Sequence, residues 1–236
     1  NAPIGVFDSG VGGLTVAREI MRQIPNERIV YFGDTARVPY GSKSKDNIIK
    51  FSRQIIRFLQ TENVKAIVIA CNTASALALD EMQQEFDLPI LGVVKPGAKV
   101  AVETTANKRI GLIGTEANIR SGVYTRYIKS LDDEAKVFEK ACPLFVPLVE
   151  EGWLHDDITL QVASRYLEEL KEKDIDTLIM GCTHYPLIRS TIRKVMGDKV
   201  NLVNPAYETA IELKNLLERD NLANKCDVDS PSSMYR

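Results

Sequence analysis

The chain has 236 residues, a formal net charge of −2, and 44% hydrophobic and 26% charged residues, which is typical of a soluble globular protein. The near-neutral charge without a basic tract argues against nucleic acid as a partner, and no apolar run approaches the ~20 residues of a membrane span. The four cysteines, Cys71, Cys142, Cys182 and Cys226, form neither a CxxC pair nor a dense framework. With no secretory leader visible, we expect a cytoplasmic protein.

The first apolar segment, Pro3–Phe7, predicts a short buried strand. A glycine-rich turn from Asp8 to Thr15 follows and leads into a helix that ends near Ile24. The turn lacks the G-x-G-x-x-G and P-loop patterns, and the carboxylate of Asp8 would repel a phosphate, so the turn suits an ammonium group. Alternatively, Asp8 and Ser9 only cap the next helix.

The second predicted strand, Arg28–Phe32, ends in a long polar loop, Gly33–Ser42. Binding groups are often found on such loops. Asp34 in this loop either pairs with Arg37 on the surface or orients or deprotonates a nearby thiol. A helix from about Lys45 to Thr61 leads to the next strand.

The stretch Lys65–Met82 places a cysteine between a buried strand and a helix. The strand is predicted at Ala66–Ala70, and Asn72 and Thr73 are strong N-cap residues for the helix that follows. The thiol of Cys71 therefore lies at a helix amino terminus, a position that suits a bound anion and favours thiolate. Leu88–Val94 predicts another short strand, and Lys95-Pro96-Gly97 is expected to break the chain.

The second half of the chain repeats the first. RIGLIGTEANIRSG aligns with PIGVFDSGVGG, with Thr115-Glu116 in place of Asp8-Ser9. Asp176–Met196 again reads as strand, Cys182, Thr183-His184 and amphipathic helix. We interpret this as an internal duplication. It predicts an α/β fold of two pseudo-symmetric domains, with parallel sheets flanked by helices and the active site in the cleft between them.

The remaining segments complete this alternation. Pro143–Gly152 is expected to be a loop or strand, because it contains two prolines and a Glu pair. The tail from Asp220 is polar with few apolar anchors, and its Cys226 is expected to be exposed and chemically incidental. The other predicted elements are a strand at Val137–Ala141, a helix at Asp157–Lys173, a strand at Lys199–Val203 and a helix at Ala206–Arg219.

Two thiols on opposite sides of one cleft are suited to moving a proton across a carbon. A thiolate takes a hydrogen from one face and a thiol returns one to the other, which inverts the stereocentre without a metal, redox group or cofactor. His184 could tune the thiol of Cys182, and Asp34 that of Cys71. The helix amino termini predict a carboxylate-bearing substrate.

Four other interpretations compete. A Cys/His/Asp triad would make the protein a Cys-dependent amidohydrolase, but it leaves the second cysteine idle. Cys71, Cys182 and His184 could form a zinc site, although their spacing is unusual for zinc ligands. The two cysteines could be a redox pair, although such pairs usually share a CxxC motif. A two-lobed amino-acid-binding module would need no cysteines.

Four motifs carry a resemblance to a known family. In chain order they are D-S-G-V-G-G-L-T (Asp8–Thr15), G-D-T-A-R-V-P-Y-G (Gly33–Gly41), A-C-N-T-A-S (Ala70–Ser75) and G-C-T-H-Y-P (Gly181–Pro186). Together they resemble the glutamate racemases of the aspartate/glutamate racemase superfamily. These are cofactor-independent bacterial enzymes that interconvert L- and D-glutamate and supply D-glutamate for peptidoglycan. The two long blocks favour glutamate over the alternative, an aspartate or other amino-acid racemase of the same superfamily.

The resemblance implies a role for each matching residue. Cys71 and Cys182 would be the proton donors and acceptors, assisted by Asp34 and His184. It implies no cofactor, no metal and a homodimer. It also implies a first domain of residues 1–97 plus 205–236 and a second of residues 98–204. The residues implied to bind or lie near glutamate are Asp8, Ser9, Tyr40, Gly41, Asn72, Thr73, Thr183, His184 and Glu150.

The chain departs from the family pattern at two places. Asn204–Tyr207 precedes Glu208-Thr209-Ala210, where family members often have a Ser-Gly pair. The family also usually continues past Arg236 with another strand and helix.

Overall fold

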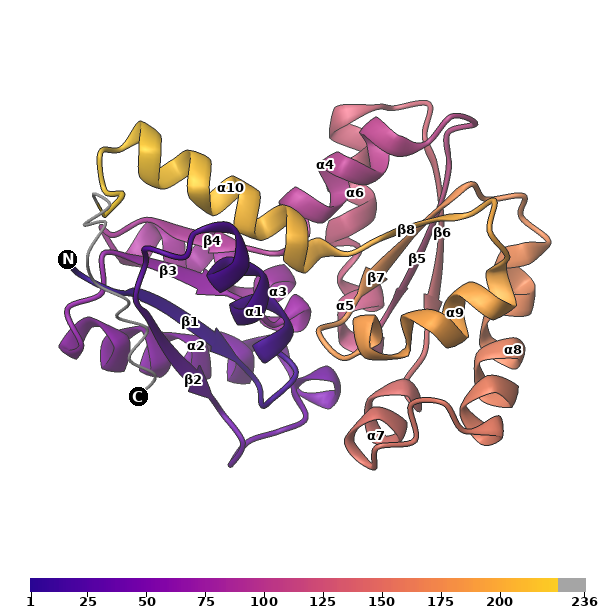
Figure 1. The fold of residues 1–236 in the computed structure, drawn as a ribbon, viewed down its shortest axis with the longest axis horizontal. Helices are drawn as coiled ribbons and strands as arrows, with labels where there is room; N and C mark the ends of the chain where they lie inside the picture. Colours follow the sequence, from indigo (N-terminus) through magenta and orange to yellow (C-terminus); the bar gives the residue numbers. More distant parts are fainter. Residues whose placement is uncertain (225–236) are drawn as a thin grey trace. The chain divides into compact units, whose positions relative to one another are not determined.

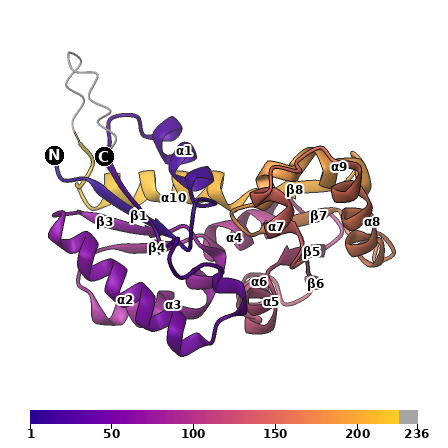
Figure 2. The same ribbon diagram turned by 90° about the horizontal axis from the view of Figure 1, so that it is seen from below.

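The computed structural model describes residues 1–224, which divide into two compact units. One unit contains Asn1–Val93 and the chain from Ala206 onward, and the other contains Val94–Pro205 (Figures 1 and 2). The border that the sequence suggested after residue 97 falls inside helix α4 (Val94–Thr104). Lys95, Pro96 and Gly97 do not break the chain, because a proline is tolerated in the first turn of a helix.

The first unit is a four-stranded parallel sheet in the order β2-β1-β3-β4. Strands and helices alternate much as the hydrophobic periodicity predicts, and the predicted helix over residues 45–61 has the observed bounds. The elements are β1 (Ile4–Asp8), α1 (Leu14–Gln23), β2 (Ile29–Gly33), the 3-10 turn η1 (Tyr40–Ser42), α2 (Lys45–Thr61), β3 (Ala66–Ile69), α3 (Asn72–Glu85), β4 (Ile90–Gly92) and α10 (Pro205–Arg219).

Both faces of the first sheet are covered by helices, so its strands are almost continuously apolar. Alternate residues of each strand point to opposite faces. Phe7 and Ile67 pack against α2 and α3, while Val6 and Val68 pack against α1 and α10. Figure 2 shows the two helix pairs on opposite sides of β1 and β3.

The second unit repeats this topology, with a parallel sheet in the order β6-β5-β7-β8. The identical strand order confirms the predicted pair of parallel-sheet α/β domains. The elements are α4, β5 (Arg109–Gly114), α5 (Glu116–Ser121), α6 (Val123–Leu131), β6 (Lys136–Ala141), α7 (Phe145–Glu150), α8 (Asp157–Lys171), β7 (Thr177–Gly181), the 3-10 turn η2 (Tyr185–Ile188), α9 (Arg189–Met196) and β8 (Asn201–Val203).

Two segments of the second unit differ from the prediction. Pro143–Gly152 was expected to be a loop or strand, but it contains α7, because Pro147 lies in the first turn of that helix, where its missing N–H is not needed. The predicted helix after His184 begins as η2, with Pro186 near its start, and becomes α-helical only at Arg189. Phe145 and Val149 of α7 are buried, which fixes Glu150 at the end of this helix.

Within residues 1–224, no helix combines the length and the apolar character that crossing a membrane requires. Cys226, which we expected to be exposed, lies outside the described residues.

Candidate active site

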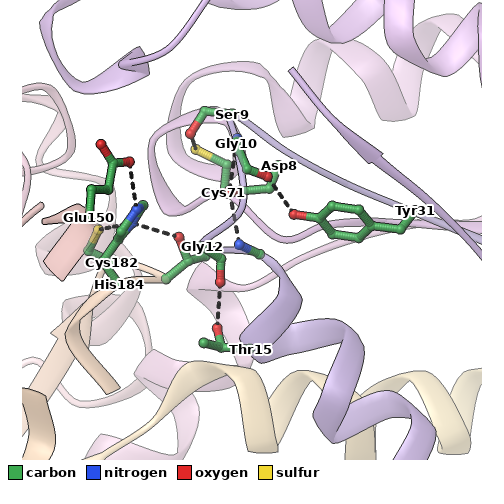
Figure 3. A network of polar contacts seen from close by, with 12 residues as sticks. Asp8, Ser9, Gly10, Gly12, Thr15, Tyr31, Cys71, Glu150, Cys182 and His184 are labelled. Atoms are coloured by element: carbon green, nitrogen blue, oxygen red, sulfur yellow. Dashed lines mark hydrogen bonds and ion pairs between the residues drawn. The ribbon is translucent and has the colours of Figure 1, made fainter. Parts of the chain in front are cut away.

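Cys71 occupies the turn between β3 and α3 and is itself the N-cap of α3. Its sulfur accepts the backbone N–H of Ala74 at 3.5 Å, and its thiol donates to Oγ of Ser9 at 3.8 Å (Figure 3). Asn72 and Thr73, the predicted caps, lie instead in the first turn of α3 and are buried. A sulfur can replace their oxygens as the cap because it reaches the third residue of the helix, as a serine oxygen would.

The glycine-rich turn of residues 8–15 is held by hydrogen bonds from several directions. Oδ2 of Asp8 accepts the backbone N–H groups of Gly10 at 3.1 Å and Gly13 at 2.9 Å. The hydroxyl of Tyr31 donates to the carbonyl of Gly10 at 2.7 Å (Figure 3). A Cβ at Gly13 would lie 2.3 Å from Cβ of Asp8, so the turn requires glycine there. Asp8 therefore organises the turn, and it does so from a fully buried position.

Burial is the largest influence on the thiol of Cys71. The pKa of Cys71 is raised to about 12, chiefly by burial and then by the Asp8 carboxylate, while hydrogen bonds with Ala74 and Ser9 act in the opposite direction. We expected the helix amino terminus to favour the thiolate. It acts in that direction, but desolvation of the sulfur outweighs it, because burial disfavours the charged form.

Asp34 is buried and paired. Its carboxylate lies 2.8 Å from Nε of Arg37 and accepts the hydroxyl of Tyr40. The guanidinium of Arg37 also lies over the ring of Phe51 at 4.3 Å. Burial, followed by the hydrogen bond to Asp34, raises the pKa of Tyr40 above its ordinary value. In the described structure, Asp34 makes no hydrogen bond to Cys71; its contacts fasten the loop that continues into Gly41.

Cys182 follows β7 and has a different environment. Its sulfur lies 3.8 Å from Nδ1 of His184, which is also 3.4 Å from Oγ1 of Thr183. Nε2 of His184 lies 3.0 Å from Oε1 of Glu150 (Figure 3). Cys182, Thr183 and His184 are buried, whereas the Glu150 side chain is 41% exposed. The structure thus brings Glu150, His184 and Cys182 into one chain of polar contacts.

Sequence reasoning missed several residues that support these two sites. It assigned no role to Tyr31 or Asn118, and it treated Arg37 only as a surface partner of Asp34. Thr115 caps α5 by accepting the N–H of Asn118 at 3.3 Å, and the Asn118 side chain reaches the strand that precedes Cys182. The repeat alignment identified the position of Thr115, since it follows β5 as Asp8 ends β1. No local pattern signalled Tyr31 or Asn118.

The described residues contain no group of three or more His, Cys, Asp or Glu side chains that could hold a metal ion. Cys71, Cys142 and Cys182 are buried thiols that form no disulfide bond among the described residues. The surroundings of Cys71 and those of Cys182, each taken within its own unit, offer thiols, an imidazole, carboxylates and helix N–H groups, which are groups that can take part in proton transfer.

Comparisons with known proteins identify the family of the chain. The sequence profile of Asp/Glu/Hydantoin racemase matches residues 4–211. A glutamate racemase from Geobacter metallireducens is 50% identical over 207 residues, covering 88% of this chain and 77% of that protein.

Solved structures give the same result. A glutamate racemase from Bacillus anthracis has a TM-score of 0.93 at 43% identity, covering 95% of this chain and 85% of that chain. A glutamate racemase from Francisella tularensis, solved in complex with D-glutamate, has a TM-score of 0.90 at 41% identity, covering 96% and 85%. The chain therefore belongs to the Asp/Glu/Hydantoin racemase family.

Proposed function

We propose that this protein is a glutamate racemase that interconverts L- and D-glutamate by proton transfer at Cα between two thiols. The observation that carries the proposal is the repeated placement of a buried cysteine at the carboxyl end of a central strand, Cys71 after β3 and Cys182 after β7. The relatives at 41–50% identity support glutamate as the substrate. By resemblance, the enzyme acts in the cytoplasm as a homodimer and supplies D-glutamate for peptidoglycan.

In this reaction one cysteine, as thiolate, removes the Cα proton, and the other, as thiol, donates a proton to the opposite face. The base ends as a thiol and the acid as a thiolate, so the charge is unchanged and the roles are exchanged for the reverse direction. The Ala74 N–H and the Ser9 hydroxyl support the sulfur of Cys71. His184, held by Glu150, supports the sulfur of Cys182.

The remaining polar residues are assigned to substrate binding. Asp8 would receive the ammonium group of glutamate, since its carboxylate lies in the turn beside Ser9. Asn72 and Thr73 in the first turn of α3, together with Thr183, would bind carboxylates, because helix N–H groups favour anions. Tyr40 and Gly41 would line the site from the loop that Asp34 fastens.

The test is to incubate the purified protein with L-glutamate, D-glutamate, L-aspartate or L-glutamine without added cofactor, and to separate the enantiomers on a chiral column. We expect both glutamate enantiomers to reach the same near-equal mixture, with no ammonia released from glutamine. Turnover of aspartate alone would favour the other racemases of the family, and ammonia release would favour a Cys-dependent amidohydrolase.

A further inference from the structure

A buried amide connects α5 to the strand that ends at Cys182. Asn118 is 1% exposed, and its Nδ2 donates to the carbonyl oxygen of Gly181 at 2.9 Å. Its backbone N–H is held by Oγ1 of Thr115, and its carbonyl accepts the hydroxyl of Ser121. The side chain is therefore anchored on α5 and directed at the residue immediately before the thiol.

The strands provide the space for this amide by carrying glycine at two facing positions. Gly114 and Gly181 are paired in register at the ends of β5 and β7. A Cβ at Gly114 would lie 3.0 Å from Nδ2 of Asn118, and one at Gly181 would lie 3.1 Å from the same atom. Glycine at both positions therefore leaves the room that the Asn118 amide occupies beside the end of β7.

The other half of the amide is left without a partner. Oδ1 of Asn118 is buried and accepts no hydrogen bond from the described residues. An unpaired buried acceptor costs desolvation free energy, so a site selected for stability alone would be better filled by an apolar side chain. What the amide adds is the N–H donor on the carbonyl of Gly181.

We propose that Asn118 is a positioning residue for Cys182: it fixes the Gly181–Cys182 peptide plane and thereby aims the sulfur at the reacting carbon. The carbonyl of Gly181 and the N–H of Cys182 belong to one rigid peptide group, so a donor on the former sets the direction of the latter. This inference rests on the proposed racemase function, since it assigns a role within that reaction.

The test compares Asn118→Asp with Asn118→Leu. In Asn118→Asp the ionised carboxylate faces the Gly181 carbonyl and repels it, whereas the protonated form donates an O–H to it. We expect Asn118→Asp to lower the rate by about 10²-fold at alkaline pH, as displacement of a reacting group does, and to regain activity relative to wild type as the pH falls. Asn118→Leu should lose activity at every pH. The same rate–pH profile for both variants would overturn the proposal.

The matched control is Asn107→Asp. Nδ2 of Asn107 donates to the carbonyl of Asp174 at 2.8 Å, while its Oδ1 accepts the N–H of Arg109 at the start of β5. This substitution removes the same kind of bond at the opposite end of the sheet from Cys182. We expect wild-type rates. A pH-dependent loss in Asn107→Asp equal to that in Asn118→Asp would show that the effect is not specific to Cys182.

A second readout does not depend on racemase activity. Iodoacetamide labelling, mapped by mass spectrometry, should change at Cys182 but not at Cys71 when Asn118 is replaced by Asp. If wild-type protein fails to racemise glutamate, the proposed function is wrong, and this labelling still decides the role of Asn118. Equal changes at both cysteines, or a change at neither, would contradict it.

Discussion

Oε1 of Glu150 lies 3.0 Å from Nε2 of His184, whose other ring nitrogen lies 3.8 Å from the sulfur of Cys182. Within the described residues of its own unit, the sulfur of Cys71 contacts the Ala74 N–H and the Ser9 hydroxyl rather than an imidazole. The two units therefore place their thiols at equivalent backbone positions, after β3 and after β7, but surround them with different polar groups. The predictions for the two halves differ accordingly.

Replacing His184 or Glu150 should impair the step at Cys182. We expect His184→Ala to lower kcat by about 10²- to 10⁴-fold, the usual contribution of a general acid or base. Glu150→Gln should cost about tenfold, because the carboxylate acts through the imidazole it orients. Steady-state kinetics in both directions measure this. Wild-type kcat in Glu150→Gln would show that the 3.0 Å contact has no catalytic role.

Each cysteine should be indispensable for racemisation, but not for a half-reaction. Cys71→Ser and Cys182→Ser should each abolish racemisation of glutamate. On 3-chloroglutamate, whose chloride leaves after Cα deprotonation, each variant should process one enantiomer only, and the two variants should choose opposite enantiomers. Equal elimination from both enantiomers by one variant would contradict the assignment of one thiol to each face.

Removing the charge of Asp8 should make Cys71 easier to ionise. Burial and the Asp8 carboxylate together raise the pKa of Cys71 to about 12, the carboxylate because it repels the thiolate. Asp8→Asn removes that repulsion while keeping an oxygen to accept the Gly10 and Gly13 N–H groups. The pH profile of Cys71 alkylation should therefore move to lower pH. A move to higher pH would mean that Asp8 acts on the thiol in another way.

Cys142 should contribute to the pH dependence of stability without a role in catalysis. Burial raises its pKa from an ordinary value of 9.0 to about 12. When folding raises the pKa of a group, the group stabilises the protein fully at pH values below its pKa in the unfolded state. This stabilisation is lost as the pH rises through its pKa in the folded state. Between pH 9 and 12 we expect the free energy of unfolding of the wild type to fall by up to about 4 kcal/mol relative to that of Cys142→Ala. Urea unfolding at a series of pH values measures this difference. A pH-independent difference between the two proteins would contradict this.

Asp34→Asn should affect the stability of the fold more than the rate of racemisation. The substitution removes the charge of a buried carboxylate that pairs with Arg37 and accepts the hydroxyl of Tyr40. We therefore expect a loss of about 1–3 kcal/mol in the free energy of unfolding. The folded variant should keep a rate far above that of the cysteine variants. Lost racemisation with unchanged thermal stability would restore the alternative, in which Asp34 assists the thiol of Cys71 directly.

The sequence was informative where the signal is local. Apolar runs followed by a cysteine and helix formers located β3, α3 and β7, and the repeat predicted two sheets of the same topology. Pro143 and Pro147 misled the prediction for α7, because a proline gives the same local signal in a first helical turn as in a loop. Burial of the Cys71 sulfur also depends on packing, and its effect on the pKa is therefore not readable from the sequence.

The sequence also gave no indication of the residues that hydrogen-bond to the backbone near the two thiols. Tyr31 reaches Gly10 from the neighbouring strand, and Asn118 reaches Gly181 from the helix after β5. Both bonds join residues far apart in the chain, and both end on a backbone carbonyl, for which sequence has no signature. The Glu pair at residues 150–151 was visible, but its relation to His184 depends on where α7 packs.

The most direct test of the two-thiol mechanism is a single-turnover reaction of L-glutamate in D₂O, with Cα labelling followed by NMR and chiral separation. Two thiols predict D-glutamate that carries deuterium at Cα from the first turnover, while unreacted L-glutamate retains its hydrogen. D-glutamate that keeps the original hydrogen would mean that a single group removes and returns the proton, and the mechanism proposed for Cys71 and Cys182 would be wrong.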